Sequence, residues 1–358
     1  MRTGTAQVRR SARRFVSRVR VRPSVAASSS ALALVLVGAG LACAADVQSR
    51  PATFRSAGYA LAGTVTGPAE NPVAGVLLLP GSGPVDRDGL AKAVPAMPPV
   101  YRQWAERLGE AGFVVLRYDK RYLTHPDVDI PAFDQEAQIA DALAAMAYLR
   151  ALPDLTARPL FVVGHSEGGT LAPLVAERSG GVAGVVIVNS IVFPVDELVV
   201  AQLQAQPQVP RTTVEDVRRQ LGEIRGGSFP DGALLLGAGA GYWSQWIAYS
   251  RDAEQTLSRS TVPLLLIHCS NDATLPGDTL ARNVAVLRRV AEKKKDAQLR
   301  ELQDLDHLGM RAGEREVASD LVQIVVDWLR RESAAARGRV STDDAKPAES
   351  GGEGDAQS

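Results

Sequence analysis

Short runs of consecutive apolar residues recur along the middle of the chain. Such runs, without polar alternation, are typical of strands buried on both faces of a parallel sheet. A looser alternation over Tyr59–Thr66 is typical of an edge strand, and Gln298–Leu302 resembles a last strand. The buried runs are Val76–Leu79, Phe113–Leu116, Leu160–Val163, Val185–Val188 and Val262–Ile267.

Stretches with apolar residues at helical spacing lie between these runs. Each stripe places its apolar side chains on one face of a helix, where they would pack on the sheet. Strands that alternate with helices indicate βαβ units and therefore an α/β fold with a mostly parallel, doubly wound sheet. The stripes comprise Val100, Trp104 and Leu108; Ile139, Leu143, Met146 and Leu149; and Val317, Leu321, Ile324 and Trp328.

The segment 193–258 breaks this rhythm between two predicted strands. It holds a charged helical stretch over Thr213–Arg225 and an aromatic patch around Trp243 and Trp246. We expect a mostly helical lid over the carboxyl edge of the sheet, with the aromatic residues lining an apolar pocket or forming the lid's own core. The predicted domain spans residues 58–332.

The two ends of the chain differ from this domain in composition. Residues 46–57 are mostly polar and predict a linker, and residues 333–358 have almost no large apolar residue and predict a disordered tail. Residues 1–45 hold eight arginines and no acidic residue. The arginines precede the apolar stretch 31–41, which has the size of a signal-peptide core and is too short to span a bilayer comfortably.

Small residues at positions 42–45 offer a cleavage site, so residues 1–45 predict a signal peptide and an exported protein, periplasmic or extracellular. A basic tail with a short anchor is the alternative. Leu41-Ala42-Cys43 resembles the end of a lipoprotein lipobox, although Gly40 stands at the usual Leu position. Cys43 is therefore a candidate lipid anchor, with simple cleavage nearby as the other outcome.

Charge narrows the class of partner. The formal net charge is zero, but without residues 1–45 the chain keeps 32 basic and 40 acidic groups, a balance near −8. This balance argues against nucleic acid as the main partner. The one remaining cysteine, Cys269, cannot form an internal disulfide, so the domain depends on its core.

The most informative motif is Gly164-His165-Ser166-Glu167-Gly168. It directly follows the apolar run 160–163 and directly precedes a helical stretch. G-x-S-x-G at a strand-to-helix junction is the nucleophile elbow of serine hydrolases, in which the serine hydroxyl is exposed on a sharp turn. Small residues flank the serine because larger side chains would collide with the neighbouring strand and helix.

A serine nucleophile needs a histidine base and an acid that orients it. His307 follows the last predicted strand, as the chain order Ser, acid, His requires, so we expect it to be the base. Asp272 follows the preceding strand and is the expected acid, with Asp196 as the main rival. Asp278 looks more like a helix cap. The other three histidines, at positions 125, 165 and 268, are expected to lack a catalytic role.

An oxyanion hole requires two backbone N–H groups. The residue after the elbow serine, Glu167, supplies the first. The glycine-rich loop Leu79–Pro84 supplies the second, for which we expect Ser82 N–H. Ser82 itself could be mistaken for a nucleophile, but no helix follows it.

The chain resembles the α/β-hydrolase superfamily, and most of all its bacterial exported esterase and serine-aminopeptidase-like branch. The resemblance spans residues 58–332 and rests on three motifs in order, at Gly81–Gly89, Arg117–Arg121 and Gly164–Gly169. It departs from relatives at Tyr122–Pro126, where they continue with a glycine-rich loop that borders the pocket. Asp86, Arg87 and Asp88 are expected to brace the oxyanion loop, as we call the glycine-rich loop Leu79–Pro84, through ion pairs.

The resemblance implies an α/β-hydrolase fold with an inserted helical lid, and a serine hydrolase that cleaves carboxylic esters of a small-molecule acyl substrate. No metal or organic cofactor is expected. One alternative is a serine aminopeptidase of the same fold, whose lid acids would hold a free amine. The other is a non-catalytic binding protein on a hydrolase scaffold.

Overall fold

The computed structural model describes residues 46–94 and 96–343. The predicted signal peptide at 1–45, the candidate lipidation site Cys43 and residues 344–358 of the predicted tail lie outside this range. Among the described residues, no helix combines the length and the hydropathy that a membrane crossing requires.

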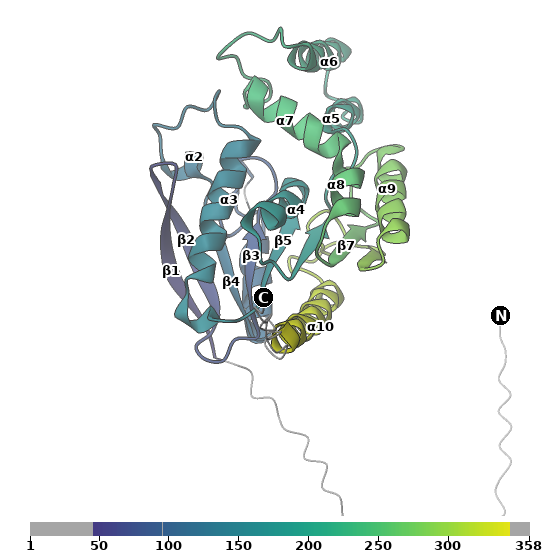
Figure 1. Ribbon diagram of the computed structural model, residues 1–358. Coiled ribbons are helices and arrows are strands. Elements are labelled where there is room, and N and C mark those ends of the chain that lie inside the picture. The colour runs from purple at the N-terminus through teal and green to yellow at the C-terminus, as the bar shows by residue number, and fades with distance from the viewer. Residues whose placement is uncertain (1–45, 95, 344–358) are drawn as a thin grey trace, which may run out of the picture. The chain divides into compact units, whose positions relative to one another are not determined.

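In the described part of the chain, an eight-stranded sheet runs through the domain in the order β1-β2-β4-β3-β5-β6-β7-β8 (Figure 1). The pairs β1–β2 and β2–β4 are antiparallel, and every other pair is parallel. The bounds are β1 (Val47–Ser56), β2 (Tyr59–Pro68), β3 (Ala74–Leu79), β4 (Phe113–Tyr118), β5 (Leu160–His165), β6 (Gly184–Val188), β7 (Leu264–Cys269) and β8 (Ala297–Leu302).

The predicted apolar runs form the centre of this sheet. In β3, Val76 lies opposite Val115 of β4 and Phe161 of β5, and all three side chains are buried. Every residue of β3, β4, β5, β6 and β7 is buried, as expected of parallel strands that are covered on both faces. The predicted mostly parallel sheet is thus confirmed.

Helices cover both faces of the sheet and enclose two cores. On one face, α1 (Val100–Glu110) and α10 (Ser319–Asp343) pack on alternate side chains of the strands. On the other face lie α3 (Gln135–Arg150), α4 (Glu167–Ser179), α8 (Ala253–Arg259) and α9 (Thr279–Lys293). Two short elements lie in the connections: α2 (Arg121–Thr124) between β4 and α3, and a 3₁₀ turn at Pro153–Leu155 between α3 and β5.

Three further helices, α5 (Val195–Gln204), α6 (Arg211–Gly226) and α7 (Ala240–Arg251), lie at one end of the sheet (Figure 1). They have a hydrophobic cluster of their own, which includes Leu221, Trp243 and Trp246. They occupy most of the segment 193–258 in which the sequence predicts a lid. The helix α8, by contrast, buries Ala253 and Leu257 in the core that α3, α4 and α9 form with the sheet.

The predicted linker at 46–57 is wrong, because Val47–Ser56 forms the edge strand β1. It pairs with β2 along its whole length, from Val47 opposite Pro68 to Ser56 opposite Tyr59. Its side chains alternate, so that Ala52, Phe54 and Ser56 are buried while the residues between them are exposed. One buried face is enough to fix this strand on the sheet.

The predicted disordered tail also begins too early. Residues 333–343 continue α10, and Ser333 is fully buried. Ala334, Ala335 and Ala336 have high intrinsic helix propensity, which allows the helix to extend past its last large apolar residues.

Candidate active site

Ser166 stands between β5 and α4, as the elbow motif predicts. Its backbone has φ 54° and ψ −121°, a region that non-glycine residues avoid and that costs about 1–3 kcal/mol. Hydrogen bonds hold this strained turn: Ser166 N donates to Val188 O at 3.0 Å, and Gly169 N donates to Ser166 O at 3.0 Å. The neighbouring strand β6 therefore helps to fix the position of the serine.

The glycines of the elbow are required by close backbone contacts. A Cβ atom on Gly164 would lie 2.2 Å from Gly168 O, and one on Gly168 would lie 2.4 Å from Leu79 O. Neither neighbour is a flexible side chain that could move away. The elbow therefore packs directly against the end of β3, where the oxyanion loop begins.

Asp272 and His307 are brought together from the ends of β7 and β8. His307 Nδ1 lies 2.8 Å from Asp272 Oδ2, and Asp272 Oδ1 accepts hydrogen bonds from Thr274 N at 2.9 Å and Thr274 Oγ1 at 2.5 Å. A carboxylate only accepts, so Nδ1 of His307 carries the proton and Nε2 is left as a base. In the described residues Ser166 Oγ has no hydrogen-bonded partner; such contacts are often long without substrate.

The pKa of Asp272 is held below its ordinary value. Burial of this carboxyl would raise its pKa, but the hydrogen bonds from His307 and Thr274 outweigh that effect.

The two other aspartates considered for the catalytic acid have different surroundings. Asp196 forms an ion pair with Arg225 inside the lid, and Asp278 stands at the N-cap position of α9 without a capping side-chain hydrogen bond.

The backbone of His307 is fixed by two side chains to which the sequence analysis gave no role. Asn189 Nδ2 donates to His307 O at 2.8 Å, while Asn189 Oδ1 accepts from Cys269 N at 2.8 Å. His165 Nε2 lies 2.8 Å from the same carbonyl oxygen. Asn189 directly follows β6, and this position at a strand end was the signal that could have identified it.

His165 belongs to a chain of hydrogen bonds that reaches the oxyanion loop. Its Nδ1 lies 3.0 Å from Tyr101 Oη, which accepts from Gly81 N at 2.6 Å. Since His307 O can only accept, Nε2 of His165 is protonated and Nδ1 accepts from Tyr101. Burial, and the nearby His307, lower the pKa of His165 to about 3, so the ring stays neutral. His165 therefore links the loop that holds His307 to the loop that holds Gly81.

The two expected oxyanion donors are Glu167 N, which directly follows Ser166, and Ser82 N, in the loop after β3. Within the described residues, neither Glu167 N nor Ser82 N donates a hydrogen bond to another group, whereas Gly81 N is used by Tyr101. Glu167 is the first residue of α4, where N–H groups have no partner inside the helix. Both N–H groups are therefore left without an acceptor in this part of the chain.

The side chain of Glu167 is fully buried beneath the elbow. Lys120 Nζ donates to its Oε2 at 3.1 Å, and Gln135 and Gln138 donate to its Oε1 at 2.7 and 3.1 Å. Burial would raise the pKa of Glu167, but Lys120 and a hydrogen bond from Tyr242 of the lid lower it. The sequence analysis missed this cluster, although a lysine two residues past a buried strand is a signal that could have revealed it.

The expected ion pairs are confirmed for Arg87 and Asp88 but not for Asp86. In the described residues Asp86 forms no ion pair, and its Oδ1 instead accepts hydrogen bonds from Asp88 N and Leu90 N, both at 2.9 Å. Arg87 pairs with Asp119 at 2.9 Å, and Asp88 pairs with Arg117 at 2.9 Å and also with Arg102. The loop after β3 is thereby tied to the end of β4.

A cavity of about 560 Å³ lies between the oxyanion loop and the lid. Ser82 and Gly83 border it on one side, and among the described residues Lys120 is the one charged residue of its lining. Most of the remaining wall is apolar or aromatic. That part of the wall includes Phe133, Val199, Leu203, Tyr242, Trp243 and Trp246.

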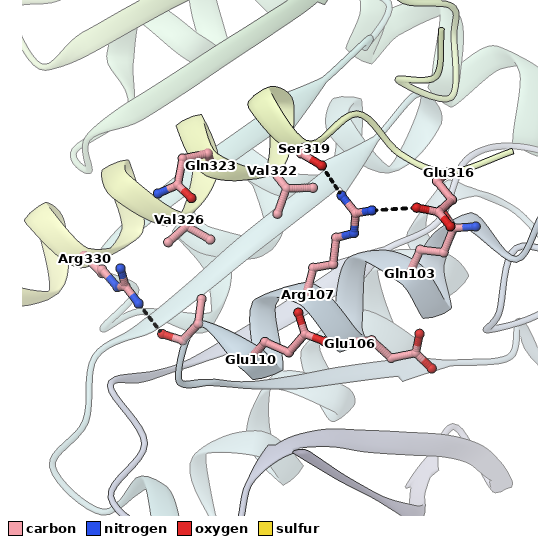
Figure 2. A pocket seen from close by; sticks show the side chains of 11 residues that line it. Gln103, Glu106, Arg107, Glu110, Glu316, Ser319, Val322, Gln323, Val326 and Arg330 are labelled. Carbon is pink, nitrogen blue, oxygen red and sulfur yellow. Dashed lines mark hydrogen bonds and ion pairs between the residues drawn. The ribbon is translucent and has the colours of Figure 1, made fainter. Parts of the chain in front are cut away.

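A second cavity, of about 650 Å³, lies between α1 and α10 (Figure 2). Arg107 spans it to Glu316 at 2.9 Å, and Arg330 donates to Ala111 O at 3.0 Å. None of the predicted site residues lines it. Figure 2 shows mostly polar side chains lining it from the two helices, together with Val322 and Val326. In the described ranges no group of three or more His, Cys, Asp or Glu side chains is arranged to hold a metal ion.

The model of the alpha/beta hydrolase family matches residues 76–320, more than half of the 358-residue chain. The chain therefore belongs to the alpha/beta hydrolase family. It is 32% identical to Esterase EstD of Thermotoga maritima over 218 residues, which make up 59% of this chain and 50% of that relative. The match thus spans about half of the relative's length.

Solved structures share the fold at low identity. An esterase of Pyrococcus furiosus is 15% identical, with a TM-score of 0.53 over 79% of this chain and 91% of that one. A proline iminopeptidase of Mycobacterium smegmatis is also 15% identical, with a TM-score of 0.54 over 80% of this chain and 100% of that one. At this identity both show the common fold alone.

Proposed function

We propose that the protein is a serine hydrolase that cleaves carboxylic esters through an acyl-enzyme. The observation that carries this proposal is the Asp272–His307 pair at 2.8 Å, placed at the same sheet edge as the strained elbow of Ser166. The three residues follow β5, β7 and β8, in the chain order Ser, acid, His. The similarity to an esterase supports the ester as the substrate.

In the proposed reaction, His307 Nε2 takes the proton of Ser166 Oγ, and the oxygen attacks the ester carbonyl. The resulting oxyanion accepts hydrogen bonds from Ser82 N and Glu167 N. His307 then returns the proton to the leaving alcohol, and the acyl group stays on Ser166. Asp272 stabilises the charged His307 throughout. Water, deprotonated by His307, then attacks the acyl carbon; its bond to Ser166 Oγ breaks, the acid leaves, and His307 returns the proton to Ser166 Oγ.

The cavity beside Ser82 favours an apolar group on the substrate. Its wall is mostly aromatic and aliphatic, and no carboxylate of the described chain lines it. Four of the five lid acids that could hold an amine are paired elsewhere: Asp196 with Arg225, Glu197 with Arg282, and Asp216 and Glu223 with Arg219. The fifth, Glu215, is exposed and does not line the cavity. An ester with an apolar acyl or alcohol part therefore suits this site better than a peptide with a free amine.

The test is hydrolysis of p-nitrophenyl esters from acetate to decanoate beside aminoacyl p-nitroanilides, with Ser166→Ala as the blank. We expect ester turnover that Ser166→Ala abolishes while the fold is kept. Turnover of anilides alone would replace the proposal with an aminopeptidase. No turnover of either the esters or the anilides, together with no labelling by a fluorophosphonate, would favour a binding protein.

We also propose, from the sequence alone, that the chain is exported by residues 1–45. N-terminal sequencing of the secreted protein tests this. A mature end near position 46 is expected, or an acylated Cys43 if the lipobox-like sequence is used. An intact N-terminus on cytosolic protein would contradict export.

A further inference from the structure

Lys120 joins two parts of the site that are far apart in sequence. Its side chain is almost fully buried, and Nζ donates to Gly81 O at 2.8 Å, to Gly83 O at 3.5 Å and to Glu167 Oε2 at 3.1 Å. The three acceptors use the three protons of the ammonium group. Lys120 therefore has no proton left for a substrate, although it borders the cavity.

The bond to Gly81 O fixes the direction of Ser82 N–H. The carbonyl of Gly81 and the N–H of Ser82 belong to one planar trans peptide unit, in which they point in opposite directions. A cation that holds the carbonyl on one side therefore directs the N–H to the other. The same peptide unit without that partner could rotate and withdraw its N–H from the site.

Other contacts restrain the loop on both sides of this peptide. Tyr101 Oη accepts from Gly81 N at 2.6 Å, and Tyr122 Oη donates to Gly83 O at 2.7 Å. A Cβ on Gly81 would lie 3.2 Å from Ser166 Cβ, so the loop packs against the nucleophile. A small rotation here would alter the geometry around Ser166.

We propose that Lys120 is a positioning residue that sets the orientation of the Ser82 N–H oxyanion donor, and that the Glu167 carboxylate holds Lys120 in place. Glu167 then serves twice, since its backbone N–H is the second donor. This inference rests on the proposed serine-hydrolase function. Positioning of this kind acts on the transition state and leaves ground-state binding nearly unchanged.

The test compares Lys120→Met with Arg121→Met. Arg121 forms the adjacent buried ion pair, with Nε 2.9 Å from Asp141 Oδ2, and has no contact with the oxyanion loop. Each substitution leaves one buried carboxylate without its cation, so Arg121→Met controls for that part of the cost to stability. The double variant Lys120→Met/Glu167→Gln removes both charges and serves if Lys120→Met alone does not fold.

The readouts are kcat and KM for a p-nitrophenyl ester, and the Ki of an aryl trifluoromethyl ketone. The ketone forms a bond from its carbonyl carbon to Ser166 Oγ, the serine proton passes to His307, and the ketone oxygen becomes an oxyanion in the hole. Loss of one oxyanion donor lowers kcat by about 100- to 1,000-fold. For Lys120→Met we expect a fall of kcat and of ketone affinity in this range, with KM nearly unchanged.

Arg121→Met should keep kcat and ketone affinity close to the wild-type values. A folded Lys120→Met, or folded double variant, with wild-type kcat and ketone affinity would overturn the inference, as would equal losses in Arg121→Met. Activity that survives in Ser166→Ala would instead overturn the proposed function. The two failures are therefore distinguishable.

Discussion

Replacement of His165 by Gln should remove a large part of the pH dependence of stability. The imidazole is buried, and its pKa is lowered to about 3 from an ordinary value of 6.5. A folded state that binds the proton more weakly than the unfolded state loses stability as pH falls below the unfolded pKa. The contribution of neutral His165 to the unfolding free energy is therefore fully present above about pH 6.5. It decreases as the pH falls from there to about 3.

The size of the effect follows from the two pKa values. At pH 5 the unfolded imidazole is mostly protonated while the folded one is neutral, which costs the folded state about 2 kcal/mol; at pH 7 the cost is near zero. His165→Gln removes this titration. The variant is expected to be less stable at pH 7, because it disturbs the bonds to Tyr101 and His307, but to lose less stability on acidification.

Urea unfolding of both proteins at pH 7 and pH 5 measures this difference. The fall in unfolding free energy between the two pH values should be about 2 kcal/mol larger for the wild type. Other titrating groups, including His268, are common to both proteins and cancel. Equal falls in the two proteins would refute the reasoning, because they would mean that His165 is not held neutral by its burial.

Three further predictions concern the triad, the elbow and the edge strand. Asp272→Asn should lower kcat for esters by about 10⁴-fold, because it removes the group that fixes the His307 tautomer; steady-state kinetics at constant fold, monitored by circular dichroism, checks this. Gly168→Ala should destabilise the protein by at least about 1–3 kcal/mol in thermal unfolding, since the new Cβ meets Leu79 O. The control Gly222→Ala, in α6, has space for its Cβ and should leave stability unchanged or raise it. A chain that begins at Gly58 should lose at least about 2 kcal/mol relative to one that begins at Asp46, from the lost burial of Phe54 alone; equal denaturant midpoints would contradict the role of β1.

The sequence predicts the inner strands well because their uninterrupted apolar runs must be buried on both faces, as in a parallel sheet that helices cover. The edge strand β1 was missed because most of its residues are polar and Pro51 interrupts it. Proline is tolerated on an edge strand, and the buried Ala52, Phe54 and Ser56 keep the period of two. The end of α10 was missed because the prediction weighted large apolar residues over alanine helix propensity.

For the site, chain order and local motif indicate Ser166, Asp272 and His307, and the structure brings Asp272 and His307 into contact. The connections around them could not be derived in the same way. Lys120 meets Gly81 and Glu167 across separations of 39 and 47 residues, and His165 meets His307 across 142. Such contacts depend on how loops converge at the sheet edge, which no local pattern encodes.

The most direct test of the central claim is the site of labelling by a fluorophosphonate, mapped by mass spectrometry of the digested protein. Attack by an activated serine expels fluoride and leaves one phosphonyl group on the oxygen. The account predicts a single label on the peptide that contains Ser166, none in Ser166→Ala, and much slower labelling in His307→Ala. A label on Ser82 instead, or wild-type labelling in His307→Ala, would contradict it.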